Sequence, residues 1–137
     1  MDLAVPCAVG VGLGILVSLL GRTAGFDRDR AYYPTILIVV ASYYALFAIL
    51  GGSTRALIIE TLVGAIFLVI AVLGFKGSLW LVVFGLIGHG VMDVFFHHHL
   101  VLNPGMPPWW PWFCMAIDVA MGAILAWMLK QSMIKSA

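Results

Sequence analysis

Residues 56–75 read ALIIETLVGAIFLVIAVLGF, a run of 20 residues in which Glu60 is the only charged side chain. The hydrocarbon core of a bilayer is about 30 Å thick, and an α-helix needs about 20 apolar residues to cross it. A helix is the expected form because lipid offers an exposed backbone group no hydrogen-bond partner. This stretch therefore predicts a transmembrane helix and, with it, an integral membrane protein.

The composition of the whole chain indicates the same class of protein. Hydrophobic residues make up 64% of the 137 residues and charged residues 9%, and the mean hydropathy is +1.12. A soluble domain is nearer half apolar and a quarter charged, so this chain has too much apolar surface to bury away from water. The formal net charge of +1 excludes electrostatic binding of nucleic acid, and two cysteines in apolar runs provide no disulfide framework.

Four further stretches have the length and apolar character of membrane-spanning helices, and turn residues such as Asn103-Pro104-Gly105 separate them. Tyrosines and tryptophans lie near their ends, as is usual at the two membrane surfaces. The sequence therefore predicts an all-α protein, a single domain over residues 1–137 that forms an integral membrane bundle of five transmembrane helices. The predicted helices cover residues 3–20, 32–50, 56–75, 79–100 and 109–129.

The distribution of lysine and arginine predicts the orientation of this bundle. Five crossings place the termini on opposite faces of the membrane, and the N-terminal face carries only Arg55. The positive-inside rule then places the N-terminus outside and the C-terminus in the cytoplasm. Asp2 stands where a signal peptide has a basic region, so we expect the first helix to be retained in a multi-pass protein of the bacterial inner membrane. The cations of the opposite face are Arg22, Arg28, Arg30, Lys76, Lys130 and Lys135.

Three acidic residues, Glu60, Asp93 and Asp118, fall inside the predicted helices. An ionisable side chain at membrane depth costs at least about 2.5 kcal/mol, so each is a candidate functional residue. With a rise of about 1.5 Å per residue, all three carboxylates lie in the middle or outer part of the membrane. We therefore expect them to converge on one outward-facing intramembrane site.

Histidines accompany these carboxylates at helical spacing. His89, Asp93 and His97 are four residues apart and share one face of the fourth predicted helix, and Cys114 and Asp118 share a similar stripe on the last. If both stripes face inward, imidazoles and carboxylates meet in a small volume. This ligand set suits Zn²⁺ best, and also suits Mn²⁺ or Fe²⁺. The sequence therefore predicts a divalent-metal site with His89, Asp93 and His97 as ligands.

The predicted function is a metal-dependent hydrolase of a lipid or other amphipathic small molecule, with membrane lipids as surroundings and partners. Glu60 or Asp118 would act as general base toward a metal-bound water. A metal-ion or proton transporter or channel is one alternative, in which the same groups form a relay. A non-catalytic membrane subunit with a metal-free His–carboxylate network is another. Participation of His98 and His99 stays open, because residues 97–99 point in different directions around a helix.

Small residues predict where helices approach one another closely. Gly10 with Gly14, and Ala116 with Ala120, are spaced four apart, a pattern that lets membrane helices pack backbone to backbone. Such a face serves either packing inside the bundle or the seam of a homo-oligomer.

Two segments, FDRDRAYYPT at 26–35 and NPGMPPWWPWFC at 103–114, resemble those of a family of small bacterial polytopic membrane proteins with no assigned function. That resemblance covers most of the chain and lends no activity. The spacing His-x-x-x-Asp-x-x-x-His at 89–97 is loosely similar to the zinc sites of the alkaline ceramidase and adiponectin receptor superfamily, which use three histidines inside a seven-helix bundle. Here five helices are predicted and the histidines come from one of them, so the likeness concerns site chemistry only. It implies hydrolysis of a lipid amide.

Overall fold

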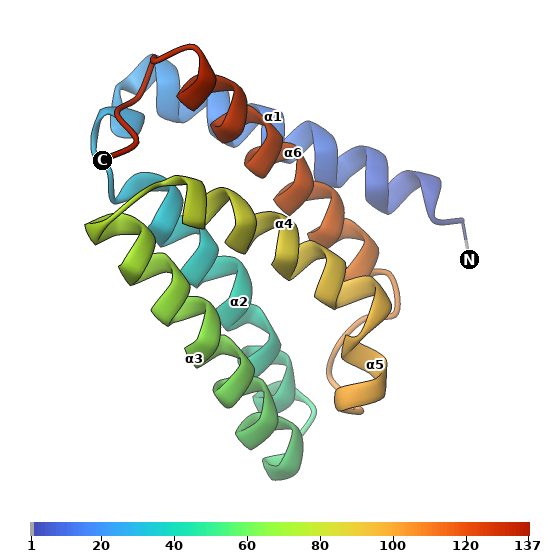
Figure 1. The fold of residues 1–137 in the computed structure, drawn as a ribbon. Coiled ribbons are helices and arrows are strands. Elements are labelled where there is room, and N and C mark those ends of the chain that lie inside the picture. The colour runs from blue at the N-terminus through green and yellow to red at the C-terminus, as the bar shows by residue number, and fades with distance from the viewer. Residues whose placement is uncertain (1) are drawn as a thin grey trace.

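Residues 2–137, the part of the chain that the computed structural model describes, form six α-helices and one short 3-10 helix and contain no strand. Helix makes up 79% of the structure, which confirms the predicted all-α class. In chain order the helices, shown in Figure 1, are α1 (Ala4–Ala24), η1 (Phe26–Arg28), α2 (Tyr32–Leu50), α3 (Thr54–Lys76), α4 (Trp80–Phe95), α5 (His97–Leu100) and α6 (Trp110–Lys130).

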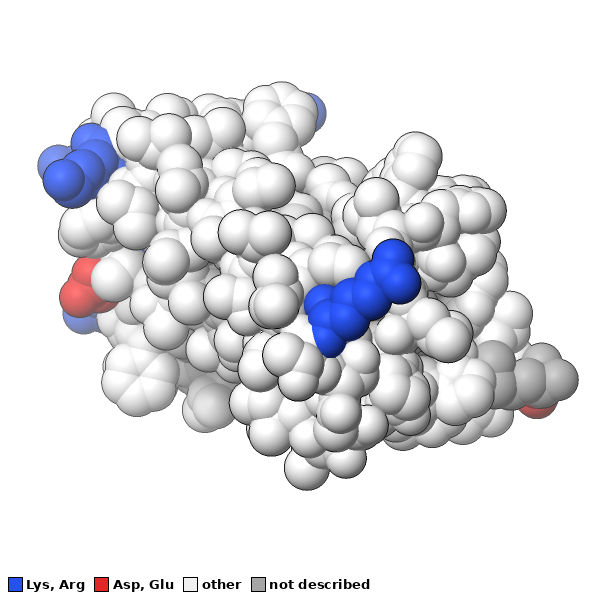
Figure 2. All heavy atoms as spheres, turned by 90° about the horizontal axis from the view of Figure 1, so that it is seen from below, with Lys and Arg blue, Asp and Glu red and all other residues white. Residues whose placement is uncertain are grey.

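Within this described part, four helices, α1, α2, α3 and α6, are long and apolar enough to cross a membrane. Their outward faces expose large hydrophobic side chains, for example Leu16 at 61% and Leu62 at 64%. Seen from below in Figure 2, the molecular surface carries few Lys, Arg, Asp or Glu side chains. Surface of this kind is unfavourable in water and favourable against lipid tails. The chain is therefore built as a multi-pass membrane protein.

The structure differs from the prediction of one continuous helix over residues 79–100. α4 ends at Phe95, Phe96 leaves the helical conformation with φ −120° and ψ −29°, and the four-residue helix α5 follows. Residues 91–101 contain no glycine or proline that would explain the break locally. Its cause is a tertiary contact, because the turn directs His97 to Glu60 of α3 at 2.7 Å. With 16 residues, α4 is shorter than the roughly 20 that a spanning helix needs.

α4 lies between two pairs of helices (Figure 1). On one side α1 packs along α6, on the other α2 packs along α3, and α4 contacts both α6 and α3. The two termini lie at opposite ends of the bundle. α4 is thus the central helix, and a side chain on it can meet residues from either pair.

The predicted small-residue faces of the first and last long helices pack against each other. A Cβ atom added at Gly10 would lie 2.5 Å from the carbonyl oxygen of Phe113 and 2.9 Å from the Cβ of Ala116. One added at Gly14 would lie 3.1 Å from the Cβ of Ala120. The α1 and α6 backbones therefore touch inside the bundle, as small residues in membrane helices allow.

We expect Gly10→Ala to lower the free energy of unfolding by about 1–3 kcal/mol, because the added methyl group forces α1 away from α6. Gly12→Ala is the matched control: a Cβ at Gly12 meets no atom of the described residues within 4 Å, and alanine favours the helix by about 1 kcal/mol. Unfolding of both variants in one detergent measures the difference. Equal stability of the two would contradict the close α1–α6 contact.

Candidate metal centre

Four side chains capable of binding a metal ion meet between α4 and α6. His89 and Asp93 come from α4, Cys114 and Asp118 from α6, and one potential ligand atom of each lies within 4.8 Å of the others. All four residues are buried, with exposed fractions of 2% or less. Each helix contributes a pair at i and i+4, the spacing that places both side chains on one face. These four residues are called the α4–α6 cluster below.

Glycines bring the two helix faces together at this level. A Cβ added at Gly90 would lie 3.1 Å from the Cα of Met115, and one at Gly122 would lie 2.9 Å from the Cγ1 of Ile87. Gly90 follows His89 directly in the chain, and Gly122 lies about one helical turn beyond the last residue of the cluster. The close approach of α4 and α6 therefore occurs at the cluster itself.

Asp118 is the centre of the contacts inside the α4–α6 cluster. Its Oδ2 lies 2.7 Å from Nδ1 of His89 and accepts a hydrogen bond from the thiol of Cys114 at 3.7 Å. Oδ2 of Asp93 lies 3.4 Å from the same His89 nitrogen, at ion-pair distance but without hydrogen-bond geometry. The imidazole is therefore held between two carboxylates.

Three carboxylate oxygens of the cluster, both of Asp93 and Oδ1 of Asp118, are buried without a hydrogen-bond partner among residues 2–137. A buried polar group without a partner costs about 1–3 kcal/mol, and a charged group more. A cation between the two carboxylates would satisfy all three oxygens. The arrangement is therefore suited to holding a positive ion.

The donor set fits a divalent transition metal. Two carboxylates balance the charge of a divalent ion, which matters in an interior where an uncompensated charge is strongly unfavourable. Imidazole, carboxylate and thiolate all bind zinc at about 2.0–2.3 Å, which places tetrahedral donors roughly 3.3–3.8 Å apart. The donors, now within 4.8 Å of one another, would therefore need side-chain shifts of about 1 Å to enclose zinc.

A second buried group lies toward the end of the bundle that carries α5. Oε1 of Glu60 is 2.7 Å from Nε2 of His97 and accepts a hydrogen bond from Nδ2 of Asn103 at 2.9 Å. The same Asn103 nitrogen donates to the backbone carbonyl of Tyr44 at 2.9 Å. Glu60, His97 and Asn103, called the Glu60 cluster below, thus join α2, α3, α5 and the connection to α6.

Aromatic rings lie between the two clusters. The centroid of the Tyr44 ring is 5.7 Å from that of His89 and 4.7 Å from that of His97. Phe67 of α3 packs against His89 from another direction, with ring centroids 4.7 Å apart. The buried Tyr44 hydroxyl lies near the Asp93 carboxylate but does not reach hydrogen-bond geometry with any described residue. The two clusters are therefore neighbours in contact through Tyr44.

The structure brings three of the predicted site residues together and places the other two apart from them. His89, Asp93 and Asp118 lie in the α4–α6 cluster. Glu60 and His97, expected as general base and metal ligand, pair with each other in the Glu60 cluster. The break after α4 causes this separation, because it turns His97 away from the stripe that it would share with the other two on a continuous helix.

An apolar groove of about 430 Å³ between α1, α2 and α6 reaches the α4–α6 cluster. Leu13 and Tyr43, each more than a third exposed, line its outer part, and Cys114 lines it from within. The thiol of Cys114 contacts Asp118, so this cysteine connects groove and cluster. Sequence reasoning did not select Cys114 as a ligand, although its spacing of four from Asp118 was the available signal.

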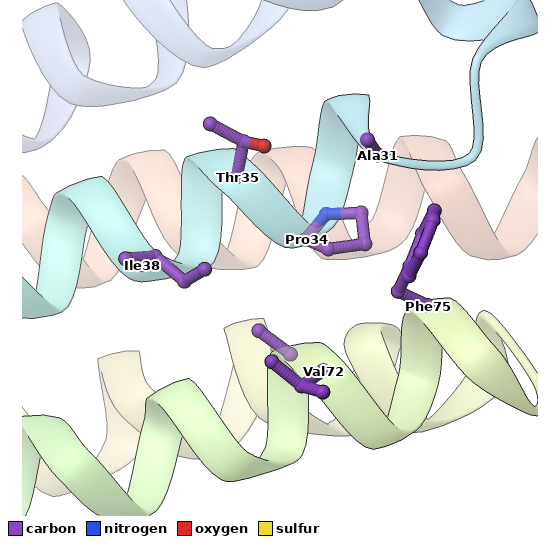
Figure 3. A pocket seen from close by; sticks show the side chains of 7 residues that line it. Ala31, Pro34, Thr35, Ile38, Val72 and Phe75 are labelled. Atoms are coloured by element: carbon purple, nitrogen blue, oxygen red, sulfur yellow. The ribbon is translucent and has the colours of Figure 1, made fainter.

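A smaller pocket of about 160 Å³ lies between α2 and α3 (Figure 3). Pro34, Ile38, Val72 and Phe75 line it, and Thr35 is the one polar residue among its described lining residues. Without an ionisable group, this pocket offers no candidate chemistry.

Comparisons with protein-family models, with curated proteins and with solved structures find no match to this chain. The resemblances drawn from sequence segments stay predictions.

Proposed function

We propose that this protein is an integral membrane protein that binds a divalent metal ion, with zinc the best match, at the α4–α6 cluster. The observation that carries the proposal is the set of three partnerless carboxylate oxygens of Asp93 and Asp118, next to His89 and Cys114. Ionisable groups are expensive at membrane depth and are retained there for function. A divalent ion supplies the missing partner and balances both carboxylates.

We place the cluster in a membrane crossed by α1, α2, α3 and α6, with α4 and α5 together forming a fifth crossing. The position of the termini at opposite ends of the bundle supports an odd number of crossings (Figure 1). The bias of Lys and Arg supports an N-terminus outside and a C-terminus in the cytoplasm. In this orientation the Glu60 cluster lies between the α4–α6 cluster and the outer surface.

The proposed activity is hydrolysis of a lipid-like substrate that enters through the groove. An apolar groove that ends at a donor of the cluster supports this reading, because it would bring an acyl chain to the site. A bound zinc ion polarises a carbonyl group and lowers the pKa of water to about 7. Glu60 is occupied by His97 and Asn103, so we assign the role of general base to Asp118.

A catalytic zinc site has three protein ligands and an open position for water. His89, Asp93 and Asp118 would supply three ligands, and Cys114 would not bind the ion while it remains a thiol, because the thiolate is the form that binds metal. Because Cys114 lines the groove, a substrate in the groove would lie next to the α4–α6 cluster.

Elemental analysis of the protein purified in detergent tests metal binding. We expect near-stoichiometric zinc in the wild type and its loss in His89→Ala and Asp93→Asn. Asp27→Asn is the matched control, since Asp27 is also buried, at 1% exposed, but pairs with Arg22 at 3.2 Å far from the cluster. Folded wild-type protein that stays free of metal after reloading with zinc would overturn the proposal.

Cys114→Ser tests the hydrolase proposal. Retained zinc with retained turnover of ester or amide lipids supports three ligands and an open position, whereas loss of zinc indicates a closed four-ligand site without hydrolysis. Cys7→Ser is the control, because the Cys7 thiol lies outside the cluster and contacts the Trp112 carbonyl at 3.8 Å. A zinc-replete wild type without turnover across ester and amide lipids would argue against a hydrolase.

A second candidate function is transport of the metal ion or of protons. A row of neighbouring side chains that leads from the α4–α6 cluster to the end of the bundle favours it. From Asp118 the chain of neighbours runs through His89, Tyr44 and His97 to the exposed His98 at the end of the bundle. Zinc flux and proton flux into proteoliposomes test the two forms of transport. Flux that Asp118→Asn leaves unchanged would remove this candidate.

A further inference from the structure

A polar pocket of about 260 Å³ lies at the end of the bundle beside the first turn of α3. Arg55, His98, His99 and the chain that follows α5 line it. The two imidazole rings lie against each other, with centroids 3.8 Å apart. This pocket shares no lining residue with the groove at Cys114 and is distinct from both buried clusters.

The charge of the pocket is positive and not compensated. Arg55 forms no salt bridge with residues 2–137, and no aspartate or glutamate is among the described residues that line the pocket. The next acid along α3, Glu60, is buried and occupied by His97 and Asn103. The amide groups in the first turn of this 23-residue helix add partial positive charge. The pocket is therefore complementary to an anion.

Exposed apolar side chains also line the pocket. Leu100 and Leu102 are 52% and 89% exposed. Such residues belong against lipid tails, whereas Arg and His side chains reach to the level of the headgroups. A phospholipid in this position would place its phosphate in the pocket and its acyl chains against the leucines.

We infer that this pocket binds a phosphate group, supplied by the headgroup of an anionic phospholipid. The guanidinium of Arg55 can donate to two phosphate oxygens at once. The imidazoles of His98 and His99 add donors, because a histidine ring carries at least one N–H in either protonation state. Binding here does not depend on the α4–α6 cluster or on its metal.

Native mass spectrometry of the protein in detergent with EDTA, titrated with phosphatidylglycerol, tests the inference. We expect Arg55→Gln, and separately the double substitution His98→Gln with His99→Gln, to weaken binding by about tenfold. Arg28→Gln is the matched control, since Arg28 is an exposed arginine at the other end of the bundle, and it should change binding by less than about twofold. EDTA keeps metal ions off the exposed histidines, and an unchanged midpoint of thermal unfolding shows that the variants fold.

A second titration with inorganic phosphate identifies the source of the ligand. If millimolar phosphate does not displace the lipid, the pocket is specific for the lipid headgroup. If phosphate displaces the lipid from the wild type but not from Arg55→Gln, the pocket binds a phosphate group from either source. Equal losses in Arg55→Gln and Arg28→Gln would overturn the inference. So would wild-type binding of phosphatidylglycerol no tighter than binding of uncharged diacylglycerol.

Discussion

Asp118→Asn is expected to lower the apparent midpoint of thermal unfolding in zinc and to raise it in EDTA. Zinc stabilises the folded protein by about 4 kcal/mol at a free concentration 1,000 times its dissociation constant. Asparagine lacks the negative charge, so we expect affinity to fall at least about 100-fold, which removes about 2.7 kcal/mol of that stabilisation. In EDTA the substitution removes a fully buried carboxylate whose Oδ1 has no partner in the described chain. Asp93 lies in the same cluster and repels that charge.

The shift in the unfolding midpoint caused by Asp118→Asn is expected to have opposite signs in zinc and in EDTA, and this distinguishes a metal site from a hydrogen-bond network. Asp27→Asn serves as control, because it weakens the ion pair with Arg22 at 3.2 Å and should lower the midpoint equally with and without zinc. Melting curves in one detergent, with zinc and with EDTA, provide the measurement. Equal destabilisation of Asp118→Asn in both conditions would mean that the α4–α6 cluster is a His–carboxylate network, and the metal proposal would fail.

The positions of helices were predictable where an apolar stretch of sequence is bounded by polar or turn residues. The predicted helix over 32–50 matches α2, and the one over 56–75 lies inside α3. Lipid makes this contrast informative, because a backbone in the membrane has few alternatives to a helix. The membrane-protein class and the all-helical fold therefore follow from composition and patterning.

The break after Phe95 was not predictable in the same way. Its neighbourhood has neither glycine nor proline, and four bulky side chains in a row, residues 96–99, do not end a helix by themselves. The bond from His97 to Glu60 joins residues 37 positions apart in the chain, and such a contact is visible only once α3 and α5 are placed in space. Tertiary contacts here override a local helical preference.

The sequence indicates which residues of each helix could belong to the candidate site, but it does not indicate which two helices bring these residues together. The i, i+4 spacing on each helix indicates which residues share a face: His89 with Asp93, and Cys114 with Asp118. The spacing does not indicate that α4 and α6 face each other, which depends on close approach at Gly90 and on α4 lying centrally in the bundle. Sequence reasoning therefore found three of the four members and assigned His97 to the same site.

Glu60→Ala is expected to lower the free energy of unfolding by about 3–5 kcal/mol, the range for removing one partner of a buried ion pair. The substitution leaves Nε2 of His97 without its acceptor, and Nδ2 of Asn103 keeps only the Tyr44 carbonyl. Glu60→Gln is the matched control, because its amide oxygen still accepts from one of these donors, and we expect a loss of about 1 kcal/mol. Hydrogen exchange should locate the damage in residues 97–109, which the Glu60 cluster holds against α2 and α3.

Zinc content of Glu60→Gln decides whether the Glu60 cluster belongs to the metal site. We expect full occupancy, because the rings of Tyr44 and Phe67 pack against His89 on the sides that face α2 and α3, and Glu60 already binds His97. Loss of zinc from a folded Glu60→Gln protein would instead place Glu60 and His97 at the metal site, where the sequence predicts a general base and a ligand, respectively.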